Sequence, residues 1–134
     1  MSVISSELCF IAIKQNPNAI SHFQSDLITI EMAKWVVSRD GLLLKHIPHQ
    51  LRKREVCEIA VSQNGNALEH VPEDLKCKSM CLSAVRRTGL AIRFVPPHLR
   101  TFDLCLVAIE QDGLAIRSVP GNIYNYVPHP TSYE

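Results

Sequence analysis

Glycine is scarce in this sequence, and its scarcity limits the folds that the chain can adopt. The 134 residues include only 5 glycines, too few for the many tight turns of an all-β sandwich or barrel. Positive and negative side chains nearly cancel, with a net charge of +1. The chain as a whole therefore has no bias toward nucleic acid or an acidic membrane surface. No apolar run is long enough to cross a bilayer.

Motifs for export and for catalysis are also missing. The first residues carry no basic side chain, and Glu7 and Lys14 interrupt the apolar stretch that a secretory signal requires. We therefore expect no Sec-type signal peptide and a cytoplasmic location. The sequence has no phosphate loop, nucleophile elbow, HExxH motif or glycine-rich dinucleotide turn. We expect a protein that is not an enzyme, with no catalytic residue, cofactor or metal.

What the sequence does contain is a 24-residue repeat that runs through five copies without insertion or deletion. Such a fixed period is the signature of a repeat architecture. The five units cover residues 5–28, 29–52, 53–76, 77–100 and 101–124, and a tail of residues 125–134 follows. Glycine recurs at Gly41, Gly65, Gly89 and Gly113, proline at Pro48, Pro72, Pro96 and Pro120, and an aliphatic residue at Leu27, Leu51, Leu75, Leu99 and Ile123. The first unit departs from this pattern at Pro17 and Gln24.

The first half of each unit predicts a helix of about three turns. In the third unit, Val56, Cys57, Ala60 and Val61 fall on one helical stripe. An acid stands in the first turn of four units, where it suits the positive end of the helix dipole. Ser5, Thr29 and Thr101 stand where N-caps are expected. We expect the following glycine to end the helix in the left-handed conformation, and Pro17 to give the first unit a different turn.

The second half of each unit predicts a shorter helix and a proline-led turn. The residue before a proline is pushed out of the α region, and the proline suits the first position of a new turn. Helices of these lengths are not stable alone, so neighbouring units must bury their faces. The expected fold is all-α, a single-domain α-solenoid of five helix–turn–short-helix repeats.

The repeat resembles a known bacterial family, the tandem repeat called domain of unknown function 4116. The pattern from Leu104 through Gly113 to Val119-Pro120 carries the resemblance, as does Val56 through Gly65 to Val71-Pro72. The resemblance implies an interaction module, an effector or a regulator of one, from an intracellular bacterium or similar microbe. It also implies a host-cell cytoplasmic location if the protein is exported. It supplies no catalytic residues.

The cysteines and three of the histidines follow the repeat. We expect the cysteines on the helical stripe to be core residues, because equivalent residues in stacked helices lie about 8–10 Å apart, too far for a disulfide. Cys77 is off the stripe and is the one thiol expected to be exposed. His22, His46 and His70 share a position, which predicts a row of half-buried rings and not a metal site. The stripe cysteines are Cys9, Cys57, Cys81 and Cys105.

Six basic residues and no acid occur from Lys76, the last residue of the third unit, to Arg100, the last residue of the fourth. Arg52, Lys76 and Arg100 share one position and are expected to form a basic ridge. We expect a protein partner to dock on one face of the stack, steered by this ridge. The alternatives are a nucleic-acid or phosphate-ligand binder using the same ridge, with nucleic acid disfavoured, and a structural unit that only self-associates. The residues expected to contact a partner are Arg52, Lys76, Arg86, Arg87, Arg93, Arg100 and Trp35.

Both terminal units carry apolar residues at positions that the repeat does not fix. Terminal units have a neighbour on one side only, and solenoids normally make that outer face polar. The apolar ends therefore predict self-association, with a homodimer as one form, or a docked partner. The residues concerned are Phe10, Ile11, Leu106 and Val107. Alternatively, the tail caps the last unit.

Overall fold

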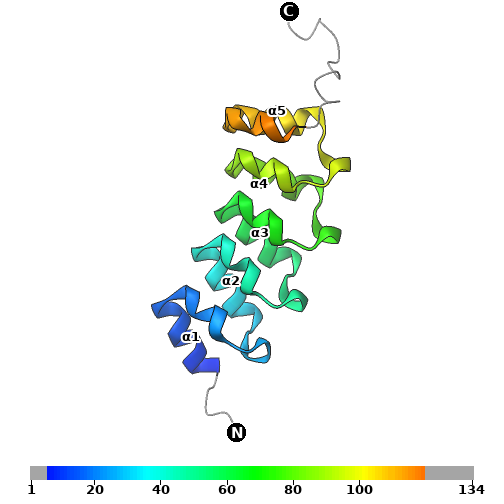
Figure 1. Cartoon of the computed structure of the whole chain (residues 1–134). Helices are drawn as coiled ribbons and strands as arrows, with labels where there is room; N and C mark the ends of the chain where they lie inside the picture. Colours follow the sequence, from blue (N-terminus) through cyan, green and yellow to red (C-terminus); the bar gives the residue numbers. More distant parts are fainter. Residues whose placement is uncertain (1–5, 120–134) are drawn as a thin grey trace, which may run out of the picture.

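The computed structural model describes residues 6–119, and this part of the chain consists of helices without a strand. Five α-helices of ten residues follow one another side by side in chain order (Figure 1). Short 3₁₀-helices connect them. The α-helices are α1 (Ser6–Gln15), α2 (Ile30–Arg39), α3 (Arg54–Gln63), α4 (Lys78–Arg87) and α5 (Phe102–Gln111).

Two 3₁₀-helices separate each α-helix from the next. The six-residue ones are η1 (Pro17–His22), η3 (Gly41–His46), η5 (Gly65–His70), η7 (Gly89–Phe94) and η9 (Gly113–Ser118). The three-residue ones are η2 (Ser25–Leu27), η4 (His49–Leu51), η6 (Glu73–Leu75) and η8 (Pro97–Leu99). Every described element therefore recurs at the 24-residue step of the sequence. None of the described helices is long and apolar enough to cross a membrane.

The predicted N-caps account for where two α-helices begin. The hydroxyl of Thr29 accepts a hydrogen bond from the backbone N–H of Met32, and that of Thr101 accepts one from Leu104, both at 3.2 Å. An acid lies in the first turn of α1, α2, α3 and α5. These features satisfy exposed N–H groups and complement the helix dipole. Ser5, the N-cap expected for α1, lies outside the described residues.

The expectation that glycine ends each α-helix in a left-handed conformation is wrong. No described residue has a positive φ. The α-helix ends instead at the residue before the glycine, which has φ near −150° at Asp40 and Asn64. At every turn except Thr88, its side chain then caps the 3₁₀-helix, as Asp40 does by accepting from Leu42 N–H at 3.0 Å. The polar residue, not a glycine conformation, therefore turns the chain.

The same finding corrects the expectation for Pro17. Because the position needs no positive φ, proline occupies it without strain. Pro17 begins η1, and the Asn16 side chain caps it like its counterparts. The first unit thus turns as the others do. The prolines Pro48, Pro72 and Pro96 precede η4, η6 and η8 as N-cap residues, one position earlier than expected. The residue before each is extended, as predicted, with ψ near 131° at Ile47.

Glycine is required for a close approach between units. A Cβ at Gly41 or Gly65 would overlap the carbonyl oxygen of Ala60 or Ala84, and one at Gly89 would lie 2.6 Å from that of Ala108. The start of each 3₁₀-helix thus rests on the α-helix of the next unit. The core lies between the α-helices and the six-residue 3₁₀-helices. It includes Ile13, Val36, Leu44, Val61, Leu68, Val85 and Ile92, all at most 1% exposed.

Candidate protein-docking face

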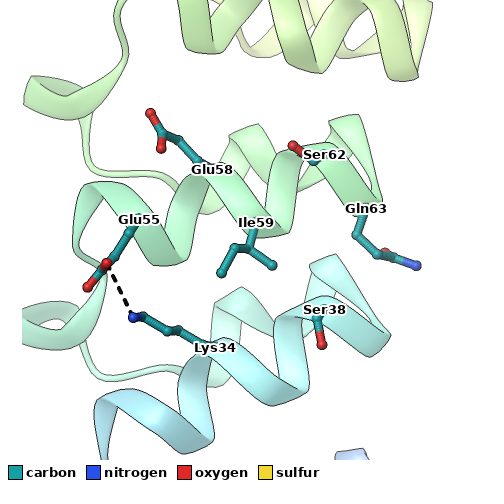
Figure 2. A pocket seen from close by; sticks show the side chains of 7 residues that line it. All are labelled: Lys34, Ser38, Glu55, Glu58, Ile59, Ser62 and Gln63. Atoms are coloured by element: carbon teal, nitrogen blue, oxygen red, sulfur yellow. Dashed lines mark ion pairs between the residues drawn. The ribbon is translucent and has the colours of Figure 1, made fainter.

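An open groove of about 570 Å³ lies between α2 and α3. Figure 2 shows that α2 supplies Lys34 and Ser38, while the remaining side chains come from α3. Ile59, which is half-buried and packs against the core, is the apolar residue of the groove. The residues that line the groove are Lys34, Ser38, Glu55, Glu58, Ile59, Ser62 and Gln63.

Hydrogen bonds and an ion pair fix both ends of this groove. Lys34 Nζ lies 3.2 Å from Glu55 Oε2 (Figure 2), with 39% and 61% of these side chains exposed. At the other end, Gln63 Oε1 accepts from Gly41 N–H at 2.6 Å and its Nε2 donates to the Arg39 carbonyl at 3.2 Å. Gln63 is therefore a structural link between α2 and α3. Glu58 and Ser62 are exposed along the groove.

The grooved surface continues from α3 onto α4. A second hollow of about 310 Å³ is lined by residues of both helices, including Glu58, Ser62, Ser79 and Ser83. A third, of about 350 Å³, is lined by Ser62, Ser83, Arg86 and Arg87. Ser62 lines all three hollows, so they form one surface, which we call the groove face. It comprises Lys34, Ser38, Glu55, Glu58, Ile59, Ser62, Gln63, Ser79, Ser83, Arg86 and Arg87.

Charge is distributed unevenly over the groove face. Glu55 and Glu58 lie in the first half of α3, while Arg86 and Arg87 occupy the last turn of α4. This placement suits the dipoles of both helices. Arg87 Nε donates a hydrogen bond of 3.3 Å to the Gln63 carbonyl, which lies at the C-terminal end of α3. The face therefore presents an acidic part and a basic part separated by serines.

The predicted basic ridge takes part in the fold itself. Arg52 donates to three backbone carbonyls: Lys45 at 3.1 Å and Ile47 at 2.9 Å within its own unit, and His70 at 2.9 Å in the next. Arg100 donates to the equivalent carbonyls of Val95, Arg93 and Ser118. Lys76 pairs with Glu73 and donates to Phe94 O. Arg52 and Arg100 link the C-terminal ends of consecutive six-residue 3₁₀-helices, and Lys76 links η6 to the end of η7. We leave these three side chains out of the groove face.

The structure places the remaining predicted contact residues in two other regions. Arg93 is exposed on η7 and lies 4.7 Å from the Phe94 ring. Trp35 is half-buried between α1 and α2. Its ring meets the Phe10 ring edge-on, with 6.5 Å between the ring centroids, and the Arg39 guanidinium lies 4.8 Å from the Trp35 centroid. Only Arg86 and Arg87 of the predicted set thus line the groove face. The others make the contacts described here within the chain.

The histidine row has the predicted half-buried character at two of its three positions. His46 and His70 are half-buried and His22 is exposed. Burial lowers the pKa of His46, helped by the charges of Lys45 and His22, and burial also lowers the pKa of His70. These rings therefore favour the neutral form in the folded protein. Within residues 6–119 no group of histidine, cysteine and acidic side chains is arranged to hold a metal ion.

The four stripe cysteines are core residues as predicted, whereas Cys77, which was expected to be exposed, is half-buried. Cys9, Cys57, Cys81 and Cys105 are at most 1% exposed, and burial raises the pKa of Cys57 and of Cys81 to about 11. Cys77 is half-buried at the N-cap of α4. Its Sγ lies 3.3 Å from Ser79 Oγ and accepts from Arg54 at 3.4 Å. Hydrogen bonds from Ser79, Met80 N–H and Arg54 lower the pKa of the Cys77 thiol to about 7.

Most residues of the groove face were not predicted from the sequence. Glu58, Ser62 and Ser83 occupy positions where the five units differ in residue type, so the repeat pattern draws no attention to them. The available signal was this variation itself. Positions fixed by the repeat serve packing, whereas variable helix positions beside the buried stripe are left for the surface.

Comparison with known families agrees with the resemblance seen in the sequence. The family model described as Domain of unknown function (DUF4116) matches two adjacent segments, residues 31–76 and 77–129. The matches cover more than half of the chain, and the chain belongs to this family. No curated protein and no solved structure matches it significantly.

Proposed function

We propose that this member of the DUF4116 family is a solenoid of five 24-residue units that binds another protein along the groove face. Two observations support the solenoid. The α-helices begin 24 residues apart, and Gly41, Gly65 and Gly89 each approach the backbone of the following unit in the same way. A stack of this kind offers one extended surface made from equivalent positions of successive units.

The continuity of the three hollows through Ser62 is the observation that carries the binding proposal. The hollows are open and lie on consecutive helices, unlike the enclosed pocket that a small ligand prefers. The serines and the charges of both signs give this shallow surface the polar, solvent-accessible character of an interface rim, with Ile59 as its half-buried apolar residue. A protein segment that crosses α2, α3 and α4 fits it best.

The charges of the groove face indicate the chemistry of the partner. Because Glu55 already pairs with Lys34, a complementary segment has a basic residue facing Glu58 and acidic residues facing Arg86 and Arg87. Such complementarity mainly sets the association rate and selects against wrong partners. We propose no catalytic activity for this surface. The module acts in the cytoplasm of the producing cell, or in that of a host cell when it is exported as an effector.

Charge reversal on the groove face tests this function. We expect Arg86→Glu with Arg87→Glu to weaken capture of a partner protein by tenfold or more, since removing a charge pair at an interface typically costs over 1.4 kcal/mol. The control reverses Lys45 and Arg117, which are exposed on 3₁₀-helices, and should retain capture. Equal capture by both variants would contradict the proposal. Strong salt-dependent retention of the wild type on DNA would instead favour the nucleic-acid alternative.

A further inference from the structure

The three interfaces from the second unit to the fifth share one arrangement with two complementary sides, whereas the first unit has Pro17 in place of the glycine. On one side, the glycine that begins a six-residue 3₁₀-helix leaves room for a carbonyl oxygen. On the other side, the α-helix of the next unit supplies that oxygen, from Ala60, Ala84 or Ala108. The glycine N–H also donates across the junction, from Gly41 to Gln63 Oε1 and from Gly65 to Thr88 Oγ1 at 3.0 Å.

The last unit has the glycine of this arrangement, but among the described residues no following α-helix supplies the carbonyl oxygen. Gly113 occupies the repeat position of Gly89, yet a Cβ built on it meets no atom within 4 Å, and the residue is exposed. Leu106 is 43% exposed and Leu114 57%, whereas Leu82 and Leu90 at the same positions one unit earlier are half-buried. Among the described residues, the outer face of α5 and η9 is therefore a unit junction without its following unit.

The first unit presents the matching second side. Glu7, Phe10, Ile11 and Lys14 of α1 line an open hollow of about 550 Å³. These are the repeat positions of Glu55, Glu58, Ile59 and Ser62, which α3 contributes to the groove against α2. Ile11 is 59% exposed, while Ile59 is half-buried beside α2. Ile11 of α1 thus occupies a position that a unit directs toward its predecessor, while Phe10 beside it meets Trp35 of α2.

The two open sides also complement each other residue by residue. Ala12 and Gln15 stand at the repeat positions of Ala60 and Gln63, the residues that meet Gly41. Adjacent helices contribute equivalent positions to one groove, as Ser38 and Ser62 do. By the same step, Glu110 of one chain and Lys14 of another would line one groove with opposite charges. Apolar Leu106 would lie beside Phe10 and Ile11.

We propose that a second copy of this chain docks head to tail, so that its α1 takes the place of a sixth unit on α5 and η9. The inference rests on the solenoid arrangement proposed above but not on the groove face. In this assembly the Ala12 carbonyl of one copy rests on Gly113 of the other, and Gln15 spans the junction as Gln63 does. Because the interface is heterologous, each added copy exposes a new end, and assembly continues until a ring closes.

Gly113→Ala tests the proposal because it changes assembly without disturbing the isolated chain. A Cβ at Gly113 contacts nothing in the described structure, whereas in the stack it would strike the Ala12 carbonyl of the next copy. Light scattering after size exclusion, over a concentration series of the full chain, should show mass increasing beyond the monomer for the wild type. Gly113→Ala should remain monomeric with an unchanged circular dichroism spectrum. A wild type that stays monomeric at all concentrations, or a Gly113→Ala variant that assembles equally well, overturns the proposal.

Mixing two variants separates head-to-tail stacking from a symmetric dimer. Ile11→Asp blocks the first unit, and Gly113→Ala blocks the last. Each variant alone should be monomeric, and the mixture should form a dimer and nothing larger, since only one productive junction remains. A symmetric dimer through one end would persist in one of the two variants alone, and that result contradicts the proposal. Both variants should still bind a partner protein through the groove face. Failure of head-to-tail stacking can therefore be distinguished from failure of the proposed function.

Discussion

At the scale of the residue, the repeat gives cysteine two different chemistries. The stripe cysteines are buried among apolar side chains, and burial raises the pKa of Cys57 and Cys81 to about 11. Cys77 instead stands at a helix start, where hydrogen bonds from Ser79, Met80 N–H and Arg54 stabilise the thiolate and lower its pKa to about 7. Thiolates are the reactive form of cysteine, so position in the unit decides reactivity.

We expect Cys77 to be alkylated by iodoacetamide much faster than the stripe cysteines, with a rate that is half-maximal near pH 7. Its pKa is lowered, so the thiolate is present above this pH and is lost as the pH falls below it. Peptide mass spectrometry across pH 5 to 10 measures this. Ser79→Ala removes the first stabilising hydrogen bond and should move the midpoint upward. A midpoint at or above pH 9 in the wild type would contradict the assignment.

At the scale of the element, glycine and arginine hold consecutive units together in different ways. Glycine allows a 3₁₀-helix to approach the next α-helix, and Arg52 and Arg100 connect the carbonyl ends of successive 3₁₀-helices. The sequence predicted that both positions matter, but it assigned the glycine to a left-handed turn and the arginines to a partner. Periodicity reveals that a position is fixed. It does not show whether a glycine is needed for its backbone conformation or for a close approach between helices. Nor does it show whether an arginine is free on the surface or donates to a backbone carbonyl 18 residues away, as Arg52 does.

The glycines offer a matched pair of substitutions. Gly65→Ala should destabilise the protein by about 2–3 kcal/mol, because the new Cβ meets the Ala84 carbonyl and lies 2.7 Å from Thr88 Cβ. Gly113→Ala should be neutral or stabilise by about 0.4–1 kcal/mol, since its Cβ enters open space and alanine restricts the unfolded chain. Urea unfolding at low protein concentration compares them. Equal losses of stability would show that the glycines serve a conformation rather than an approach.

Arg52→Ala should lower the free energy of unfolding by about 2 kcal/mol, because it removes hydrogen bonds from a charged donor and leaves the backbone carbonyls without that partner. Arg52→Lys should lose less, because Lys76 at the same position reaches the Phe94 carbonyl at 3.0 Å. Arg93→Ala is the control and should cost about 0.5–1 kcal/mol, since its guanidinium lies over the Phe94 ring, 4.7 Å from the centroid. Urea unfolding curves give all three values. An Arg52→Ala loss no larger than that of Arg93→Ala would refute the structural role.

At the scale of the whole molecule, the periodic residues predicted the helical content and the 24-residue step of the elements. The groove face was harder to predict, because Glu58, Ser62 and Ser83 vary between units and become neighbours only when α3 and α4 lie side by side. Of the predicted arginines, Arg86 and Arg87 belong to this face. Their predicted role in binding stays a prediction, and it now concerns a surface of mixed charge.

Hydrogen–deuterium exchange of the captured complex tests the central claim, binding of a protein along the groove face, most directly. Wild-type chain with its partner bound is compared with the free chain, peptide by peptide. Our account predicts added protection in peptides of α2, α3 and α4 that contain Lys34, Glu58, Ser62 and Arg86, with little change in η3 and η7. Protection confined to η3, η7 and the residues around Arg52 and Arg100 would contradict it and place the partner on the opposite elements of the stack.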